Sequence, residues 1–367
     1  MAETMKALRF HGNQDVRLDN IPIPPLRPGW VKIKNGWAGV CGSDLHEYLV
    51  GPKNAPTKPH ILTGETLPTV MGHEFSGRVV ELGEGVTEGY GGAKMEVGKK
   101  CAIFPVLGDR TCVWCQRGAQ GVCPNWGFLG YSGYGGGFAE YICVDARDVH
   151  IVSDSMRLDV AALVEPIAVG WHAVKLGDPK PEDSVLVLGA GPIGIAVILS
   201  LRAHGVENIA VSELSPLRAE QARGAGALHV FNPKHNDVAE RCREVSPDGW
   251  GPQCVFECAG VQPSLDAALA SVRGQGVIVN VGIFEKDVTM NPNVLNRRSL
   301  KWVGSNIYTR QEFQEVVDAI ADGRLKEPER MITARISLEE GVEKGFKALI
   351  HEREKHVKIL IGVDDDP

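Results

Sequence analysis

The chain has 367 residues, of which 43% are hydrophobic and 23% charged, with a formal net charge of -7 at pH 7. These ordinary values exclude a largely disordered chain, and the acidic balance disfavours a nucleic-acid partner held through its phosphates. The length exceeds what one hydrophobic core usually supports, so two domains are expected. No apolar run predicts a membrane span, and the N-terminal residues do not resemble a signal peptide, so a cytoplasmic location is expected.

The first part of the chain, from Met5 to about Ala146, contains short apolar runs separated by glycine and proline turns. Examples are WVKIKN, FSGRVVELG and FAEYICV. Runs of this kind predict strands, and their irregular spacing predicts a β domain without a simple repeat.

From about Ala161 the pattern changes to alternating strands and helices. SVLVLG, NIAVSE, CVFECAG, GVIVNVGIF and LKWVGS predict buried strands, and PIGIAVILSLRAHG predicts a helix. SPLRAEQARGAG predicts a second helix, capped by Ser215 with Pro216 in its first turn. The alternation predicts an α/β fold with a parallel sheet covered by helices on both faces. After Ser305, one further helix is predicted in RQEFQEVVDAIADG, and this tail is expected to pack on the first domain.

A glycine-rich turn lies between the first strand and the first helix of this second part. It consists of Gly189, Ala190, Gly191, Pro192, Ile193 and Gly194. In a dinucleotide-binding fingerprint Gly189 permits the tight turn, Gly191 lets the backbone approach a pyrophosphate, and Gly194 allows close packing of helix on strand. The free amides at the helix start would bind the phosphates. The alternative is a plain turn, since glycine triplets occur by chance in a chain with 43 glycines.

Glu213 strengthens the dinucleotide interpretation, because it stands 24 positions after Gly189 at the end of the next predicted strand. A carboxylate there accepts hydrogen bonds from the adenosine ribose hydroxyls and repels a 2′-phosphate, which favours NAD over NADP. Ser212 and Arg218 weaken that preference, since a nearby cation could tolerate a phosphate.

Three cysteines in GDRTCVWCQRGAQGVCPN suggest a metal site. Cys112 and Cys115 have the C-x-x-C spacing that lets two thiolates reach one metal, and Cys123 follows eight positions later. A closed structural zinc takes four ligands, so the fourth must come from elsewhere or the site is incomplete. A redox pair is disfavoured, because no thioredoxin-like context surrounds these residues, and the nine cysteines of the chain are expected to remain reduced.

A second set of metal-ligating side chains lies in three separate segments. Cys41 occurs in GVCGSDLHEY, His73 and Glu74 in MGHEF, and Glu165 in LVEPIAVGWH. Taken singly, Cys41 and His73 are explained better as buried core residues than as metal ligands.

These motifs together resemble the zinc-dependent medium-chain dehydrogenase/reductase family over essentially the whole chain. CGSDLH, GHEFSGRVVELGEGV, the cysteine cluster, EP and VLGAGPIG occur in the order of that family. Within it, DLHEYLVGP, the insertion through PHILTGETLPTVMGHEFSG, and EPIAVGWHAV look most like the 2,3-butanediol (acetoin) dehydrogenases, with sorbitol and other polyol dehydrogenases as neighbours.

The resemblance implies two domains and an oligomer. A GroES-like irregular β catalytic domain should comprise residues 1–165 and 308–367, and a Rossmann-type NAD-binding domain residues 166–307. The active site should lie in the cleft between them, at the carboxyl ends of the parallel strands. A closed homodimer or homotetramer is expected.

The resemblance also implies a catalytic zinc held by Cys41, His73 and Glu165, with Glu74 as an alternative or exchanging ligand. Such a zinc lowers the pKa of a bound alcohol, so that hydride can leave for the nicotinamide.

Three further residues receive roles from the resemblance. Ser43 and His46 would carry the alcohol proton to solvent, although a turn hydroxyl and a surface imidazole are the simpler alternatives. Lys358, in the closing segment HVKILI, would reach the cofactor pyrophosphate; a solvated lysine is its alternative.

In the family the second zinc is held by four cysteines spaced C-x-x-C-x-x-C-x7-C. Placing Cys123 last makes Cys115 third and Cys112 second, and puts Asp109 at the first position. An aspartate oxygen can bind zinc, so a structural zinc with one carboxylate and three thiolates is expected. The alternative is that this segment, here called the lobe, keeps its three cysteines but binds no metal.

The sequence therefore predicts an NAD-dependent zinc alcohol dehydrogenase that oxidises a small secondary alcohol or vicinal diol, of the 2,3-butanediol and acetoin type. A sorbitol or other polyol dehydrogenase is the alternative. A nucleotide-binding protein without catalysis, and a zinc-free reductase, are disfavoured because Cys41 and His73 are both present.

Overall fold

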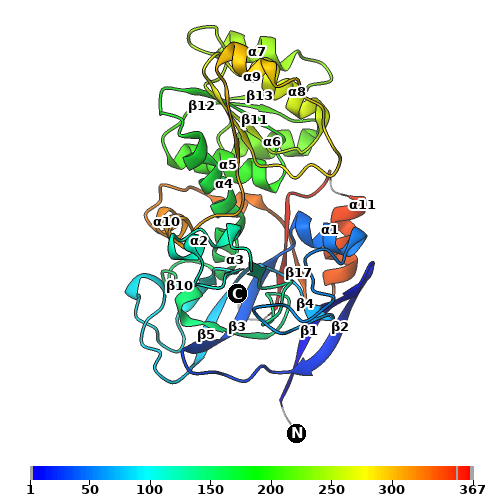
Figure 1. Ribbon diagram of the computed structural model, residues 1–367, viewed down its shortest axis with the longest axis vertical. Helices are drawn as coiled ribbons and strands as arrows, with labels where there is room; N and C mark the ends of the chain where they lie inside the picture. The colour runs from blue at the N-terminus through cyan, green and yellow to red at the C-terminus, as the bar shows by residue number, and fades with distance from the viewer. Residues whose placement is uncertain (1–2, 353, 364–367) are drawn as a thin grey trace. The chain divides into compact units, whose positions relative to one another are not determined.

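The chain folds into two units, each with its own sheets, and the computed structural model describes residues 3–352 and 354–363 of it (Figure 1). The first unit comprises Met1–Glu165, Thr309–Ala321 and Ile332–Pro367. The second comprises Pro166–Tyr308 and Asp322–Met331.

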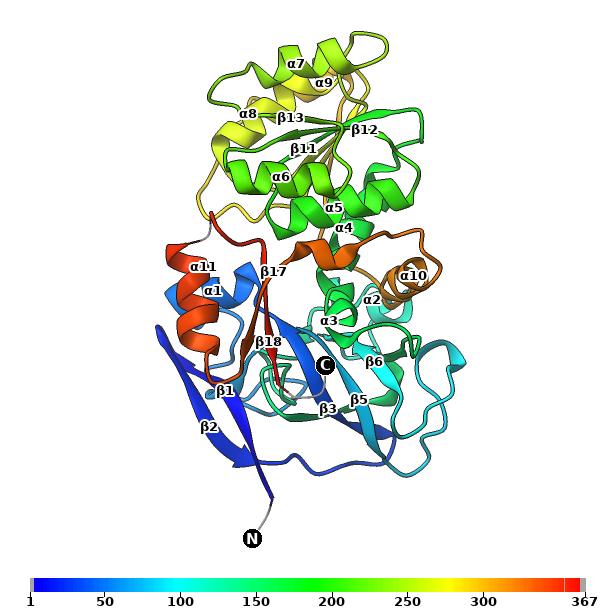
Figure 2. The ribbon, with the colours of Figure 1, turned by 180° about the vertical axis from the view of Figure 1, so that it is seen from behind.

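The first unit is mainly β. Its strands are β1 (Thr4–Gly12), β2 (Asp15–Pro22), β3 (Trp30–Gly39), β4 (Thr69–Val70), β5 (Glu74–Leu82), β6 (Lys100–Ile103), β7 (Val106–Leu107), β8 (Gly127–Phe128), β9 (Tyr141–Asp145), β10 (Val149–Ile151), β17 (Ile332–Ser337) and β18 (Lys358–Gly362). The larger sheet has the order β10-β6-β5-β3-β18-β17, and β9 also pairs with β3 (Figure 2). Two smaller sheets have the orders β2-β1-β4 and β7-β8. The C-terminal strand β18 pairs with β3, so the last segment of the chain contributes to the larger sheet, whereas the N-terminal strand β1 lies in a smaller one.

Helices of the first unit lie at the ends of its strands. They are α1 (Gly42–Val50), α2 (Val113–Gln116), α3 (Leu158–Ala161), α10 (Arg310–Ala321) and α11 (Ala348–His351). One face of α10 buries Phe313, Val316 and Val317, the apolar positions of the helix that the sequence predicts.

The second unit is a parallel sheet with helices on both faces. The strands are β11 (Ser184–Leu188), β12 (Asn208–Ser212), β13 (His229–Phe231), β14 (Cys254–Glu257), β15 (Val277–Asn280) and β16 (Lys301–Gly304). Their order is β13-β12-β11-β14-β15-β16, with every neighbouring pair parallel, which is the doubly wound order of dinucleotide-binding domains. All five residues of β11 are buried, as expected for a strand covered on both faces. The predicted fold class is confirmed; β13 is a strand that the sequence pattern did not predict.

Two layers of helices cover this sheet. The helices are α4 (Val164–Gly177), α5 (Pro192–Ala203), α6 (Pro216–Gly224), α7 (Val238–Val245), α8 (Gln262–Ser271) and α9 (Asn293–Arg298). In both ribbon views α7 and α8 cover one face, and α5 and α6 cover the other (Figures 1 and 2). Ser215 accepts a hydrogen bond from the amide of Arg218, and Pro216 begins α6, so the predicted cap is confirmed.

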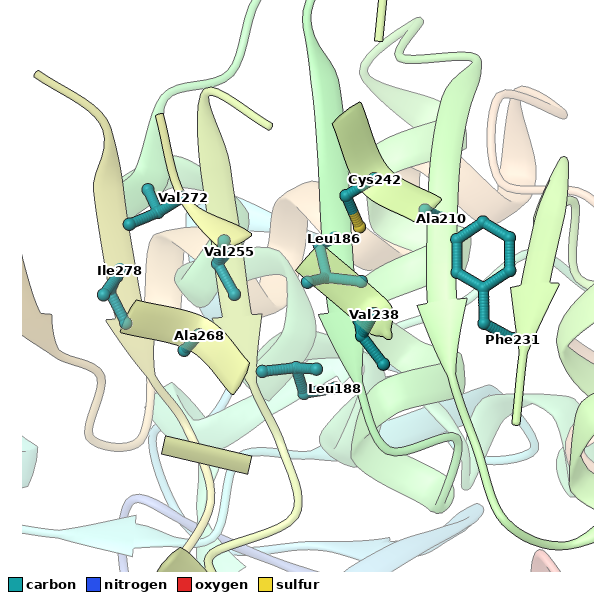
Figure 3. Close-up of a cluster of buried hydrophobic side chains, with 10 residues drawn as sticks. All are labelled: Leu186, Leu188, Ala210, Phe231, Val238, Cys242, Val255, Ala268, Val272 and Ile278. Carbon is teal, nitrogen blue, oxygen red and sulfur yellow. The ribbon is translucent and has the colours of Figure 1, made fainter. Parts of the chain in front are cut away.

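A cluster of buried side chains joins α7 and α8 to the sheet (Figure 3). Its members are Leu186, Leu188, Ala210, Phe231, Val238, Cys242, Val255, Ala268, Val272 and Ile278. Burial raises the pKa of Cys242 to about 12, so this thiol acts as a small apolar residue.

The unit boundaries differ from the expected domains at Tyr308, which belongs to the second unit, and in one longer segment. Residues Asp322–Met331 belong to the second unit, although the whole tail from residue 308 was expected in the first. The reason is packing: the short helical turn Pro328–Met331 contacts α5 and α6.

One stretch, Leu158–Gly177, is long and apolar enough by composition to span a membrane, with a mean hydropathy of 1.2. The sequence prediction that no such run exists is therefore wrong. Within the described residues 78% of the stretch is buried, and it includes the ionisable residues Asp159, Glu165 and Lys175. Burial inside the fold accounts for its apolar composition.

Candidate active site and metal centres

Cys41, His73 and Glu74 form one cluster of potential metal ligands. One ligand atom from each lies within 4.8 Å of the other two. Cys41 immediately precedes α1, and Glu74 begins β5 directly after His73. A thiol, an imidazole and a carboxylate are three donors of the kinds that hold a catalytic zinc, so these residues fit that metal.

The Glu74 carboxylate lies in space that a glycine leaves open, and a lysine binds it. Gly39 is the register partner of Glu74, and a Cβ on Gly39 would lie 2.0 Å from Glu74 Oε2. On the adjacent strand β18, the ammonium of Lys358 donates to both oxygens of Glu74, at 2.7 and 2.6 Å, and each side chain is 1% exposed. Burial alone would lower the pKa of Lys358, but the negative charges of Glu74 and Cys41 raise it, so the ammonium stays charged.

This burial excludes the solvated alternative for Lys358. Its role at the cofactor pyrophosphate stays a prediction, because the contact that the structure shows is with Glu74. Glu165 is buried in the first turn of α4, and its charge also raises the pKa of Lys358. Among the described residues, however, the carboxylate gathered with the thiol and imidazole is Glu74, so the assignment of Glu165 as a ligand stays a prediction.

Asp44 connects two of these ligands. Its Oδ2 accepts a hydrogen bond from the backbone N–H of Cys41 at 2.9 Å. Its Oδ1 accepts one from the hydroxyl of Tyr131 at 2.9 Å and lies 3.5 Å from Nδ1 of His73. At 3.5 Å the contact with His73 is an electrostatic one rather than a short hydrogen bond.

The imidazole of His73 is enclosed by aromatic rings and negative charge. Ring centroids of Phe128 and Tyr131 lie 5.4 and 5.1 Å from that of His73. Burial disfavours the charged imidazole, but the charges of Asp44 and Cys41 outweigh burial and raise the pKa of His73 well above its ordinary value. The surroundings therefore favour positive charge at this position, which is what a bound cation would supply.

Ser43 and His46 lie on α1, three residues apart. The hydroxyl of Ser43 is 3.1 Å from Cys41 Sγ and 3.4 Å from His73 Nε2, so Ser43 lies at the cluster rather than in a remote turn. Nε2 of His46 lies 2.7 Å from the ammonium of Lys53. Their roles in proton transfer stay predictions.

Asp109, Cys112, Cys115 and Cys123 form the second cluster, and one ligand atom from each lies within 4.8 Å of the others. The sulfurs of Cys112 and Cys123 are 3.7 Å apart. Burial, together with these two neighbouring thiols, raises the pKa of Cys115 to about 12. The donor set fits a structural zinc with one carboxylate and three thiolates.

Backbone amides arrange this second cluster. Oδ1 of Asp109 accepts from the amides of Thr111 and Cys112 at 3.0 and 2.9 Å, and these bonds lower the pKa of Asp109. Its Oδ2 accepts from the side-chain amide of Asn125 at 3.1 Å. A Cβ on Gly108 would lie 2.6 Å from Cys115 Sγ, so the glycine before Asp109 makes room for a ligand atom.

The glycine-rich turn has the geometry that its sequence predicts. Gly189 has φ +91°, and a Cβ on Gly194 would lie 1.9 Å from the carbonyl oxygen of Gly189. A Cβ on Gly191 would have Nη1 of Arg218 as its nearest neighbour, 4.0 Å away, so the backbone is open to a ligand there. Pro192 begins α5, whose first amides are free to bind phosphate.

Glu213 lies at the turn. Its Oε2 accepts a hydrogen bond from the amide of Ala190, and its Oε1 one from the amide of Ser215, both at 2.7 Å. The carboxylate therefore joins the end of β12 to the glycine turn, with lone pairs remaining for hydroxyl donors. Contacts of Glu213 and Arg218 with a ribose stay predictions.

Comparison with known proteins identifies the family. Residues 27–154 match the alcohol dehydrogenase GroES-like domain, and residues 192–322 match the zinc-binding dehydrogenase domain. The chain belongs to the zinc-binding alcohol dehydrogenases. This dehydrogenase is accordingly an oxidoreductase that uses zinc and NAD.

The relatives of the dehydrogenase match it over nearly its whole length. It is 41% identical to (R,R)-butanediol dehydrogenase of Bacillus subtilis over 97% of this chain and 99% of that protein, and 37% identical to (R,R)-butanediol dehydrogenase of Saccharomyces cerevisiae over 97% and 98%. A sorbitol dehydrogenase of Bacillus subtilis is 28% identical over 96% of each. The crystal structure of 2R,3R-butanediol dehydrogenase from Bacillus subtilis superposes with a TM-score of 0.90 at 39% identity, over 98% of this chain and 100% of that one.

Sequence reasoning missed several residues around the site of the dehydrogenase. Asp44 stands in the motif CGSD and received no role, although an acidic residue three positions after a predicted ligand was a signal. Tyr131 reaches Asp44 across 87 positions through tertiary packing, while Lys53 and Asn125 reach partners only 7 and 16 positions away; no regular spacing in the sequence indicates these contacts.

Proposed function

We propose that this dehydrogenase oxidises a small secondary alcohol or vicinal diol of the 2,3-butanediol and acetoin type, with NAD as hydride acceptor. The observation that carries the proposal is the cluster of Cys41, His73 and Glu74 in a chain that is 36 to 41% identical, over nearly its whole length, to three butanediol dehydrogenases. Sorbitol dehydrogenases are related at 27 to 28% identity, so a polyol is the second candidate.

When bound, zinc supplies Lewis-acid polarisation of the alcohol oxygen and NAD accepts the hydride, so that alcohol and NAD⁺ give ketone, NADH and a proton. Cys41 and His73 would hold the metal from two segments, with Glu74 or Glu165 as the carboxylate ligand. Ser43, 3.1 Å from Cys41 Sγ, accepts the proton of the substrate hydroxyl and releases its own towards His46.

His46 passes the proton to solvent. Its Nε2 accepts from the ammonium of Lys53 at 2.7 Å, and Lys53 is exposed, so this end of the path is open to the water that takes up the proton. Glu47 fixes the loop that carries Lys53, because its carboxylate accepts from the backbone amides of Lys53, Asn54 and Ala55. Lys358 neutralises the charge of Glu74.

The cofactor preference follows from Glu213. We expect its carboxylate to accept hydrogen bonds from the ribose hydroxyls and to repel a 2′-phosphate, while Arg218 lies beside the glycine turn and binds the adenosine end.

A panel of substrates tests the proposal. Purified protein is assayed for NADH formation with the three butanediol stereoisomers, sorbitol, threonine and a primary alcohol, with NAD and NADP in parallel. The highest kcat/KM is expected for a butanediol stereoisomer with NAD. A higher kcat/KM for sorbitol would establish the polyol alternative, and absence of turnover with every secondary alcohol would contradict both.

We also propose a structural zinc at Asp109, Cys112, Cys115 and Cys123, which makes two zinc ions per subunit. Metal analysis of the purified protein tests the number directly.

We further propose a cytoplasmic homodimer or homotetramer. The strand β16 is the end strand of the parallel sheet, and it carries Trp302, 37% exposed. A strand with one unpaired edge can pair with the same strand of a second copy. Light scattering gives the subunit number, and fractionation of cells gives the location.

A further inference from the structure

Tyr131 is a buried tyrosine beside the ligand cluster that none of the proposed steps uses. It is 4% exposed. The segment that carries it is brought to His73 by a close backbone approach: Gly130 has φ +88°, and a Cβ there would lie 2.4 Å from the carbonyl oxygen of Gly72. Only glycine fits this position, so the chain places Tyr131 at the cluster by backbone geometry.

The phenol hydroxyl has a specific partner. It donates to Oδ1 of Asp44 at 2.9 Å, and the hydroxyl of Ser43 also lies beside it. Burial, with the charges of Asp44 and Cys41, raises the pKa of Tyr131 well above its ordinary value, so the phenol is a protonated donor.

Asp44 is fully buried and its carboxylate faces both Cys41 and His73. Two of the groups directed at it belong to metal ligands, and the third is the Tyr131 hydroxyl. Among the described hydrogen bonds to Asp44 side-chain oxygens, Tyr131 is the one side-chain donor within 3 Å. The hydroxyl therefore fixes the position of Oδ1, the oxygen that faces Nδ1 of His73.

From this arrangement we propose that Tyr131 is a positioning residue for the catalytic metal, acting through Asp44. By holding Oδ1 opposite Nδ1, it keeps the hydrogen of His73 on Nδ1 and leaves Nε2 as the metal-binding nitrogen. Outer-shell partners of metal-bound histidine are worth about 10-fold to 100-fold in metal affinity or activity. The inference rests on the proposed catalytic zinc.

The test measures zinc release from the full-length protein. Zinc-loaded wild type, Tyr131→Phe and Tyr134→Phe are mixed with a chromophoric chelator, and the release phase that disappears in Cys41→Ser is assigned to the catalytic site. Tyr134→Phe is the matched control, because its hydroxyl donates at the same 2.9 Å distance, but to the carbonyl of Leu62. We expect Tyr131→Phe to accelerate the catalytic phase about 10-fold and to leave the other phase unchanged. Wild-type release rates in Tyr131→Phe would overturn the inference.

A double-mutant cycle separates positioning from packing, including the case in which Tyr131→Phe is unstable. Because Tyr131 acts through Asp44, the hydroxyl should matter only while Asp44 is present: Tyr131→Phe should accelerate release in wild type and have little further effect in Asp44→Asn. Additive effects would mean that the tyrosine acts by packing, against the proposal. If Cys41→Ser itself releases as much zinc as wild type, the proposed catalytic site is wrong, which is a different failure from an unchanged Tyr131→Phe.

Discussion

The two cysteine-containing clusters of the first unit are built in different ways. The proposed ligands of the catalytic zinc lie just before α1 and at the start of β5, and their positions depend on side chains from distant parts of the chain, among them Lys358. The ligands of the lobe cluster lie within fifteen residues, Asp109 to Cys123, and backbone amides of that same stretch hold the carboxylate.

Because the two clusters are held in different ways, different substitutions should disturb their metals. A change in the tertiary packing around the first cluster should weaken its metal without touching the lobe. A change within the lobe should remove its metal and leave catalysis nearly intact. Each of the following substitutions tests one side of this separation.

The largest effect is expected for Cys41→Ser. Loss of a thiolate ligand removes the metal that polarises the alcohol, a contribution of several kcal/mol, so kcat/KM should fall roughly 10,000-fold. The zinc content should fall by one per subunit while the lobe keeps its metal. Cys143→Ser is the control, because Cys143 Sγ contacts only the carbonyl of Pro24 among its described hydrogen-bond partners, and it should leave kcat/KM within about 2-fold. Undiminished NADH formation by Cys41→Ser would contradict the assignment of the site.

Next in size is the change Lys358→Met, which leaves the buried carboxylate of Glu74 without its cation. Breaking a buried ion pair in this way costs about 3 to 5 kcal/mol of unfolding free energy. Lys355→Met is the matched control: its ammonium is also 2.7 Å from a carboxylate, that of Glu352, but this pair is exposed to solvent, so its loss should change the unfolding free energy far less. Urea unfolding measures both, and equal losses in the two variants would show that the Glu74 pair is not stabilising.

The sequence predicts the parts of this structure that local pattern determines. The apolar strand β11, the glycine turn at Gly189 and the capped helix α6 follow from spacing, and they are found where expected. The order of the motifs also pointed to Cys41 and His73, which lie together, but the carboxylate gathered with them among the described residues is Glu74, which the resemblance gave as the alternative ligand. In contrast, the contact between Tyr131 and Asp44 joins residues 87 positions apart, and the buried pair of Lys358 and Glu74 joins residues 284 positions apart. Such contacts exist only once the strands have packed, so no local pattern contains them.

Asp109→Ala tests the second, local metal cluster, that of Asp109, Cys112, Cys115 and Cys123. The zinc content should fall from two to one per subunit, since three thiolates alone bind the metal more weakly than a complete tetrahedral set. The kcat/KM should change by less than about 3-fold, because the catalytic cluster is held by other segments. Asp109→Cys restores the spacing of a four-cysteine site and should retain two zinc ions with slower release. A zinc content of one in the wild type would show that the lobe is a thiol cluster without a metal.

The smallest effect is expected for Asn125→Ala. The side-chain amide of Asn125 donates to Oδ2 of Asp109 at 3.1 Å, while two backbone amides continue to hold Oδ1. Loss of one outer-shell hydrogen bond should therefore accelerate zinc release from the lobe, by about 10-fold at most, without changing the zinc content. Asn13→Ala removes a comparable side-chain donor, to the carbonyl of Leu49, and should leave both release phases unchanged. If Asn125→Ala instead accelerates the phase that Cys41→Ser abolishes, the two clusters are coupled, and the separation between a tertiary and a local metal site does not hold.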